Sequence, residues 1–219
     1  MSIVIPELQR SYAGENTFEL KTPEITLSGT GYVCLIGTNG SGKSSFGDAL
    51  AESPLGANED KWYYLPQHLD RFLFAEHVLE QLSTMLAQEI DRQALISLIS
   101  DMGFKDAETM LEFPFLLMSG GERRRMALVC VFYLQPSRLI LDEPEIGVTA
   151  KENMVLLSKL HNLTASHVQI IMISHNHDIV RHSSDLICLD SGKVDRVGQT
   201  GELLADPLFE IKKYGVRFT

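Results

Sequence analysis

A glycine-rich loop between an apolar run and a helical segment constrains this chain more than any other feature. The stretch "GTNGSGKSS" follows the apolar run "YVCLI" and fits the pattern G-x-x-x-x-G-K-[ST]. Such a loop turns successive backbone N–H groups inward at a helix N-terminus, where phosphates meet amide donors and the favourable end of the helix dipole. A plain glycine turn with a surface lysine is the alternative. The strand before the loop and the helix after it favour phosphate binding.

The loop pattern also indicates which groups meet a nucleotide. Lys43 is expected to reach the β- and γ-phosphates, and the hydroxyl of Ser44 is expected to bind Mg²⁺. The predicted nucleotide-binding residues of the loop are Gly37, Thr38, Asn39, Gly40, Ser41, Gly42, Lys43, Ser44 and Ser45.

Apolar strands alternate with helical segments along most of the chain. The runs "RLILDEP", "VQIIMIS" and "LICLD" are continuously apolar, as expected for strands that are covered on both faces. Steps of three and four between apolar residues predict two successive helices in residues 76–102. The sequence therefore predicts an α/β fold with a mostly parallel sheet, a single domain over residues 1–219 and a helical lobe at residues 68–118.

Polar side chains stand where several of these apolar runs end. Asp142 suits the Mg²⁺ shell and Glu143 suits the orientation of an attacking water, with a bland pair of acids at a helix start as the alternative. His175 follows "IIMIS", at the edge where parallel sheets gather ligands, and can contact a γ-phosphate. A loop histidine is the simpler interpretation of His175 taken alone. Gln67 ends "YYLPQ", and its amide can bind Mg²⁺ or sense the attacking water.

A second glycine-containing stretch, "MSGGERRR", also suits a phosphate. Ser119, Gly120 and Gly121 supply a hydroxyl and a closely approachable backbone at the start of a helix. The basic run 123–125 that follows is expected to be a solvated face of that helix.

Composition limits the class of protein. The net charge of −10 and the pI near 5.1 oppose a protein that binds nucleic acid as its main task. No apolar run reaches the roughly 18 residues that a membrane helix needs, and the N-terminus lacks the features of a signal peptide. Three widely spaced cysteines within apolar runs predict buried free thiols, so we expect a cytosolic chain.

The chain resembles ATP-binding cassette (ABC) ATPase domains over nearly all of its length. The motifs that carry this resemblance occur in the family's order: the phosphate loop, Gln67, "MSGGE", "LILDEP" and His175. The resemblance implies a P-loop NTPase core with ATP and Mg²⁺ as cofactors. It also implies head-to-tail pairing with a second ABC ATPase domain, as a homodimer or a heterodimer. Each ATP would then lie between the phosphate loop of one domain and the Ser119, Gly120, Gly121 and Glu122 segment of the other.

The resemblance extends to the base-binding aromatic residue and to a subfamily. Tyr12 matches the aromatic residue that stacks on adenine in this family, although an ordinary core or surface tyrosine fits the sequence equally well. The stretch "YLPQHLDRFLFAEHVLEQL" and the ending "GELLADPLFEIKKYGVRF" most resemble energy-coupling factor and cobalt-type importer ATPases.

The chain departs from the family pattern at three places. Gln67 follows Lys43 more closely than in most relatives, which implies a reduced N-terminal antiparallel β lobe. Glu122 replaces the signature glutamine, a tolerated variant. Thr149 stands where the family usually has an aspartate in the D-loop, the segment after the catalytic acid, and this places normal communication between paired sites in question.

The resemblance predicts an ATP-hydrolysing subunit that drives import of a small solute. Because the chain carries no membrane span, separate transmembrane subunits are expected as partners, with this subunit peripheral on the inner face of the cell membrane and no nucleic acid as a partner. Two alternatives remain. One is a soluble cassette ATPase of DNA repair, translation or cofactor assembly, and the other is a nucleotide-gated module that hydrolyses poorly.

Overall fold

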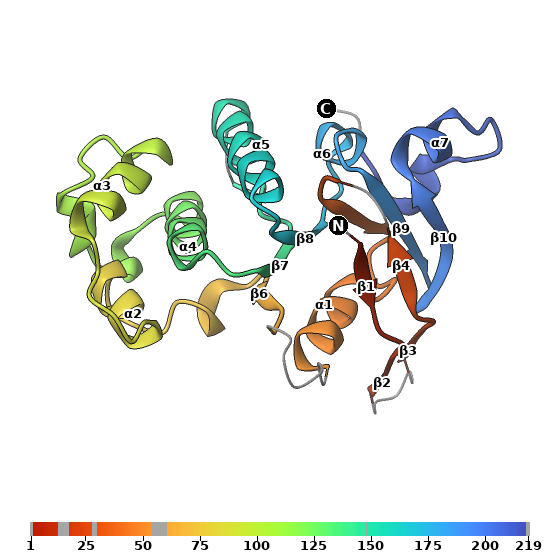
Figure 1. The fold of residues 1–219 in the computed structure, drawn as a ribbon, viewed down its shortest axis with the longest axis horizontal. Helices are drawn as coiled ribbons and strands as arrows, with labels where there is room; N and C mark the ends of the chain where they lie inside the picture. Colours follow the sequence, from red (N-terminus) through yellow and green to blue (C-terminus); the bar gives the residue numbers. More distant parts are fainter. Residues whose placement is uncertain (1, 13–17, 28–29, 54–60, 148, 218–219) are drawn as a thin grey trace. The chain divides into compact units, whose positions relative to one another are not determined.

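The computed structural model describes residues 2–12, 18–27, 30–53, 61–147 and 149–217. The chain forms two compact units (Figure 1). Unit 1 comprises residues 1–64, 137–143 and 160–219, and unit 2 comprises residues 65–136 and 144–159. The range 68–118, expected to be a helical lobe, falls within unit 2.

Unit 1 carries a six-stranded sheet in the order β10-β9-β5-β8-β7-β6. Strand β5 pairs in parallel with β8 and with β9, and β7 pairs in parallel with β8, whereas β10 returns antiparallel to β9. The mostly parallel sheet predicted from the sequence is therefore confirmed. The strands are β5 (Val33–Gly37), β6 (Tyr63–Leu65), β7 (Arg138–Asp142), β8 (Gln169–Ile173), β9 (Asp185–Asp190) and β10 (Lys193–Gln199).

The central strands are apolar because both of their faces are covered. All five residues of β5 are buried, and so are the last four of β7 and of β8. A strand buried on both faces needs apolar residues at every position instead of alternate ones. This requirement explains why these runs could be recognised in the sequence.

Two short antiparallel pairs precede the sheet. Strand β1 (Ile3–Ile5) pairs with β4 (Ile25–Leu27), and β2 (Leu8–Tyr12) pairs with β3 (Phe18–Thr22). Their alternating burial places apolar side chains in the same core as β5 and β8. The N-terminal antiparallel strands expected from the sequence are present.

Unit 1 also contains helical segments. Helix α1 (Lys43–Glu52) follows the glycine-rich loop, and α6 (His177–Arg181) follows β8. Helix α7 (Thr200–Ala205) and the short 3₁₀ helix η4 (Ile211–Tyr214) lie in the C-terminal region (Figure 1). Tyr214 and Val216 are buried against β5 and β9, so the end of the described chain is part of the core.

Unit 2 is helical. Helix α4 contacts both α2 and α3, and the three helices lie together in Figure 1. The two helices predicted in residues 76–102 are therefore confirmed. The helices are α2 (Val78–Met85), α3 (Arg92–Asp101), α4 (Gly120–Leu134) and the 3₁₀ helices η1 (Leu69–Arg71), η2 (Thr109–Leu111) and η3 (Phe115–Leu117).

Helix α5 (Ala150–Ala165) contributes to both units, with residues up to Lys159 in unit 2. Among the described helices, none combines the length and the apolar character that crossing a membrane requires.

Candidate functional site

The glycine-rich loop of unit 1 has a backbone that only glycine adopts readily. Gly40 and Gly42 have φ values of 80° and 102°, and Gly42 is the N-cap of α1. A Cβ atom at Gly42 would lie 2.6 Å from Cζ of Phe18, and one at Gly37 would lie 2.6 Å from the carbonyl oxygen of Leu189. The glycines are therefore required by conformation and by close packing.

Lys43 is the first residue of α1, and its ammonium group is hydrogen-bonded to the loop backbone. Its Nζ donates to the carbonyl oxygens of Gly37, at 2.9 Å, and Thr38, at 3.0 Å. Burial lowers the pKa of Lys43, while the negative charges of Glu143 and Asp142 act to raise it. The cation is therefore positioned close enough to both acids to interact with them electrostatically.

Asp142 is buried at the carboxyl end of β7, where the hydroxyl of Tyr64 donates to its Oδ2 at 2.9 Å. Burial raises the pKa of Asp142, and hydrogen bonds from Ser44 and Tyr64 oppose that rise. The structure thus brings Ser44, at the start of α1, into contact with Asp142, and the sequence predicted that both residues bind Mg²⁺. Tyr64 was not predicted, because an aromatic residue in a strand carries no functional signal in the sequence.

Glu143 has an unusual backbone. Its φ is 48°, in the left-handed region that residues other than glycine rarely occupy. Its N–H donates to the carbonyl oxygen of Ile173 at 2.9 Å, and this bond to β8 fixes the turn at the end of β7. Such strained residues cluster at functional sites, where the surrounding structure imposes the conformation.

His175 faces Glu143, and the C-terminal segment holds it in place. Its Nε2 lies 3.3 Å from Oε1 of Glu143, and its Nδ1 lies 3.2 Å from the carbonyl oxygen of Gly215. Since a carbonyl oxygen can only accept, Nδ1 carries the proton. Burial, and next the charge of Lys43, lower the pKa of His175, so the ring is neutral at pH 7 and its Nε2 is an acceptor.

The C-terminal segment also contacts the backbone around His175. The N–H of Arg217 donates to the carbonyl oxygen of His175 at 2.8 Å, and the N–H of His177 donates to the carbonyl oxygen of Arg217 at 3.1 Å. Gly215 has a φ of 76°, and a Cβ there would lie 3.3 Å from Nδ1 of His175. The sequence showed only a glycine in "YGVRF", so this role of the C-terminal segment was missed.

Tyr12 is accessible and linked to the loop through a second aromatic ring. It is 37% exposed, and its ring centroid lies 6.1 Å from that of Phe18, the residue that packs on Gly42. The guanidinium of Arg10 lies 5.3 Å from the Tyr12 centroid. An exposed ring on the loop's own unit is compatible with stacking on a base.

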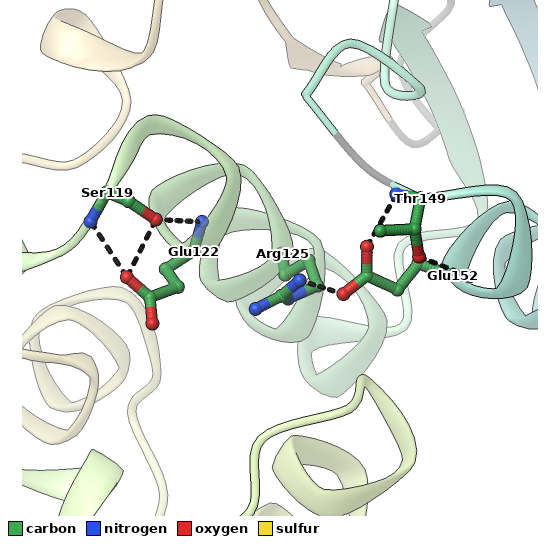
Figure 2. Close-up of polar contacts among 5 residues, drawn as sticks. All are labelled: Ser119, Glu122, Arg125, Thr149 and Glu152. Carbon is green, nitrogen blue, oxygen red and sulfur yellow. Dashed lines mark hydrogen bonds and ion pairs between the residues drawn. The ribbon is translucent and has the colours of Figure 1, made fainter.

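In unit 2, Ser119 is the N-cap of α4 and forms a reciprocal capping box with Glu122 (Figure 2). The N–H of Glu122 donates to Oγ of Ser119 at 3.3 Å, and the N–H and Oγ of Ser119 donate to Oε2 of Glu122 at 2.9 and 2.7 Å. The hydrogen bonds from Ser119 lower the pKa of Glu122. Glu122 thereby keeps a structural role as the cap of the helix.

The basic run after Ser119 was expected to be a solvated face, and this was wrong for Arg124 and Arg125, whereas the side chain of Arg123 is 38% exposed. Arg124 is buried, and its guanidinium donates to the carbonyl oxygens of Pro66, at 2.9 Å, and Gln67. Arg125 is half-buried and paired with Glu152. Arginine bonds carbonyl and carboxylate oxygens through several fixed donors, which satisfies these buried groups. The backbone of Gln67 is thereby attached to α4 within unit 2.

Thr149 precedes α5 and forms a second reciprocal pair of bonds, with Glu152 (Figure 2). The N–H of Thr149 donates to Oε2 of Glu152 at 2.6 Å, and the N–H of Glu152 donates to Oγ1 of Thr149 at 3.3 Å. Thr149 therefore caps α5 at the position where ABC ATPase domains, which the sequence resembles, usually have an aspartate. Threonine and aspartate are both common N-cap residues.

The structure gathers the predicted residues in two groups. Unit 1 holds Tyr12, the loop residues 37–45, Asp142, Glu143 and His175, and unit 2 holds Gln67, the segment 119–122 and Thr149. Within unit 1, a phosphate loop, a lysine, two acids and a histidine meet at the carboxyl ends of β5, β7 and β8. This is the edge where α/β sheets bind ligands.

Comparisons with known proteins point to one family. The family model described as ABC transporter matches residues 20–145. An alignment with energy-coupling factor transporter ATP-binding protein EcfA3 of Oenococcus oeni is 32% identical and covers 45% of this chain but only 35% of that protein. Zinc import ATP-binding protein ZnuC of Pseudomonas fluorescens is 28% identical, over 91% of this chain and 77% of that protein.

Solved structures show the same fold. A dimeric ATP-binding cassette in a post-hydrolysis state, bound to ADP and Pi, aligns with a TM-score of 0.74 and 18% identity, over 91% of this chain and 99% of that one. The family match covers more than half of the chain and includes both the phosphate loop and the acid pair. The chain is therefore a member of the ABC transporter family and an ABC-type ATPase.

Proposed function

We propose that the chain is the ATP-hydrolysing subunit of a membrane importer, and that it works as one of two ABC cassettes closed around ATP. The supporting observation is the group at the sheet edge of unit 1, where Glu143 and His175 meet beside Lys43 and Asp142. The names of the relatives, an energy-coupling factor transporter protein and a zinc import protein, support transport. Separate transmembrane subunits would then hold this chain at the inner face of the membrane.

Nucleotide binding falls to the loop and to Tyr12. Backbone N–H groups of the loop and of the start of α1 bind the phosphates, and Tyr12 stacks on the base. Lys43 exchanges its bonds to Gly37 and Thr38 for the β- and γ-phosphates. Charge stabilisation and positioning account for most catalysis of phosphoryl transfer, so a preplaced lysine contributes directly.

The donors at the loop fit Mg²⁺, which neutralises charge that develops on the phosphates. Ser44 and Asp142 supply hard oxygen atoms and already lie together. Among the described residues, there is no group of three or more acidic, histidine or cysteine side chains that could hold a metal ion. Mg²⁺ is typically held by one or two protein oxygens together with substrate phosphates, so this small set suits it.

Water activation falls to Glu143 and His175. Oε1 of Glu143 and the unprotonated Nε2 of His175 are both acceptors and lie 3.3 Å apart. A water molecule beside them can donate one proton to each, which leaves its lone pair directed away from both groups. Glu143 then orients the water towards the γ-phosphate, and positioning of this kind supplies much of the rate.

The second nucleotide contact is assigned to Ser119, Gly120 and Gly121 of a paired cassette. Ser119 is the N-cap of α4 and the two glycines are its first residues, where the backbone N–H groups of a helix start and the helix dipole favour an anion. Phosphate binding there requires the hydroxyl of Ser119 to turn from Glu122 to the γ-phosphate. The partner cassette is a second copy of this chain or a different one.

The test compares the parent with Glu143→Gln and with Glu24→Gln, an exposed control in unit 1. Release of inorganic phosphate should fall at least a hundredfold in Glu143→Gln and stay at the parent rate in Glu24→Gln, on the order expected for loss of a catalytic group. Equally slow release in the parent and in Glu143→Gln would instead support a nucleotide-gated module, which the departure at Thr149 keeps as the second candidate. Purification of the native complex should recover transmembrane subunits.

A further inference from the structure

The first turn of α4 and the loop before α5 approach each other within unit 2 more closely than side chains allow. A Cβ atom at Gly121 would lie 2.4 Å from the carbonyl oxygen of Gly147, and an added Cβ at Gly147 would lie 3.6 Å from Cα of Gly121. Two glycines therefore place the backbone of the Ser119 segment directly against the backbone of the D-loop. Close packing alone would let one segment slide past the other, so further contacts are needed to fix their relative position.

Glu152 joins both segments through a single carboxylate (Figure 2). Its Oε2 accepts from the backbone N–H of Thr149, at the end of the D-loop, and its Oε1 accepts from Nη1 of Arg125 on α4. Arg125 lies one turn along the same helix from Glu122, whose carboxylate bonds Ser119. Ser119 is thus linked to Thr149 through its bonds to Glu122, through one turn of α4, and through the bonds of Glu152 to Arg125 and Thr149.

The surroundings of the ion pair favour a fixed geometry. The side chains of Arg125 and Glu152 are only 14% and 18% exposed, so water screens them less than an ordinary surface pair. The guanidinium of Arg125 stacks over the Phe104 ring, 4.9 Å from its centroid. The Nε of Arg125 is buried and has no hydrogen-bond partner among the described residues. Glu152 therefore supplies the charged contact that orients Arg125.

We propose that Glu152 is a positioning residue that makes the start of α4 and the end of the D-loop move as one body. Thr149 is compatible with this role because it caps α5 without adding a charge that would compete with Glu152 for Arg125. The inference rests on the proposed function, in which Ser119, Gly120 and Gly121 contact the nucleotide of the paired cassette. Closure on that nucleotide would then be transmitted to Thr149 of the same copy.

The test uses ATP-driven pairing in the Glu143→Gln background, with the partner cassette that co-purifies or with a second copy. Glu152→Gln keeps an oxygen for the N–H of Thr149 but removes the charge that holds Arg125, and Arg125→Met removes the guanidinium. Each should weaken Mg·ATP-dependent pairing about tenfold in sedimentation experiments, and the double variant should be no worse than either, since both changes break one contact. Arg125→Lys should restore part of the loss.

Hydrogen exchange distinguishes this role from simple support of the fold. In the Glu143→Gln parent, Mg·ATP should protect peptides containing Ser119 and Thr149 together. In Glu152→Gln and Arg125→Met, protection should persist at Ser119 and disappear at Thr149. The matched control is Lys159→Met, which removes another ion pair of α5 in unit 2, with Asp101 at 2.6 Å, far along the helix from Thr149. It should pair and exchange like the parent.

Normal pairing and joint protection in Glu152→Gln would overturn the inference while leaving the proposed function intact. Additive losses in the double variant, or an equal loss in Lys159→Met, would also overturn it, since general weakening of unit 2 would then explain the result. Failure of the Glu143→Gln parent to pair with any cassette in Mg·ATP would overturn the proposed function itself, and this inference with it.

Discussion

At the scale of single residues, the site depends on side chains held in states that water would not favour. Lys43 is buried against carbonyl oxygens, Asp142 is buried beside Tyr64, and Glu143 adopts a left-handed backbone. Burial, and next the charge of Lys43, lower the pKa of His175. Each state costs folding free energy that the surrounding packing must supply, and shifted protonation equilibria are a frequent mark of functional sites.

The lowered pKa of His175 predicts a specific dependence of stability on pH. The unfolded chain takes up a proton at His175 near its ordinary pKa of about 6.5, whereas the folded chain takes it up only at lower pH. Between those two pKa values the unfolded state binds more protons, so stability falls as the pH drops through this window and is recovered above it. When urea unfolding is measured from pH 7.5 to pH 5, the free energy of unfolding should fall less in His175→Gln than in the parent.

A neighbouring histidine provides the control for this experiment. His177→Gln leaves His175 and its bond to Gly215 in place, so its pH dependence should match that of the parent. If the free energy of unfolding changed equally with pH in the parent and in His175→Gln, the fold would not be what keeps the ring neutral.

At the scale of elements, buried polar side chains fix the loops that lead into and out of the helices. Gln81 on α2 is fully buried, and its Nε2 donates to the carbonyl oxygen of Phe72 at 2.8 Å. Its Oε1 accepts from the N–H groups of Phe74 and Ala75, at 3.2 and 3.3 Å. One amide thus satisfies three backbone groups of the loop that follows η1.

Gln81→Leu should destabilise unit 2 because leucine fills similar space but leaves those backbone groups without partners. We expect a loss of about 2–3 kcal/mol in the free energy of unfolding, the order of magnitude for buried unsatisfied groups. Chemical denaturation measures it, with the exposed Gln88→Leu as the control, which should change stability by less than about 0.5 kcal/mol. A loss below 1 kcal/mol in Gln81→Leu would mean that the loop is held by other contacts.

At the scale of the whole molecule, the chain divides its predicted functions between two compact units. The phosphate loop, the acids and His175 belong to unit 1, while Ser119, Gln67 and Thr149 belong to unit 2. The three cysteines are likewise divided, with Cys34 and Cys188 on strands of unit 1 and Cys130 on α4. All three are buried thiols outside any disulfide bond, as the sequence predicted.

The burial of the cysteines predicts that neither unit exposes a reactive thiol. Burial raises the pKa of Cys130 to about 12 and that of Cys188 to about 12, so the reactive thiolate is scarce at pH 8. Iodoacetamide should therefore add nothing to the native chain, by intact mass, and should add three groups in denaturant. Rapid modification of one cysteine in the native chain would show that the unit containing it opens readily.

Local patterns made much of the fold and of the candidate site predictable. Continuous apolar runs identified β5, β7, β8 and β9, because the middle of a strand that is covered on both faces is apolar at successive positions. The spacing of apolar residues identified α2 and α3 in the same way. The interpretation of Arg124 and Arg125 as a solvated face was wrong, because their partners, Gln67 and Glu152, are distant in the sequence.

The sequence by itself determined the phosphate loop, since its turn depends on local backbone conformations that glycine adopts readily, such as the positive φ of Gly42. It also placed Asp142 and Glu143 at the end of an apolar strand. Only the tertiary structure decided that Tyr64 bonds Asp142, that Gly215 orients His175 and that Glu152 joins Arg125 to Thr149. Long-range contacts depend on how whole elements pack, and no spacing in the sequence encodes that packing.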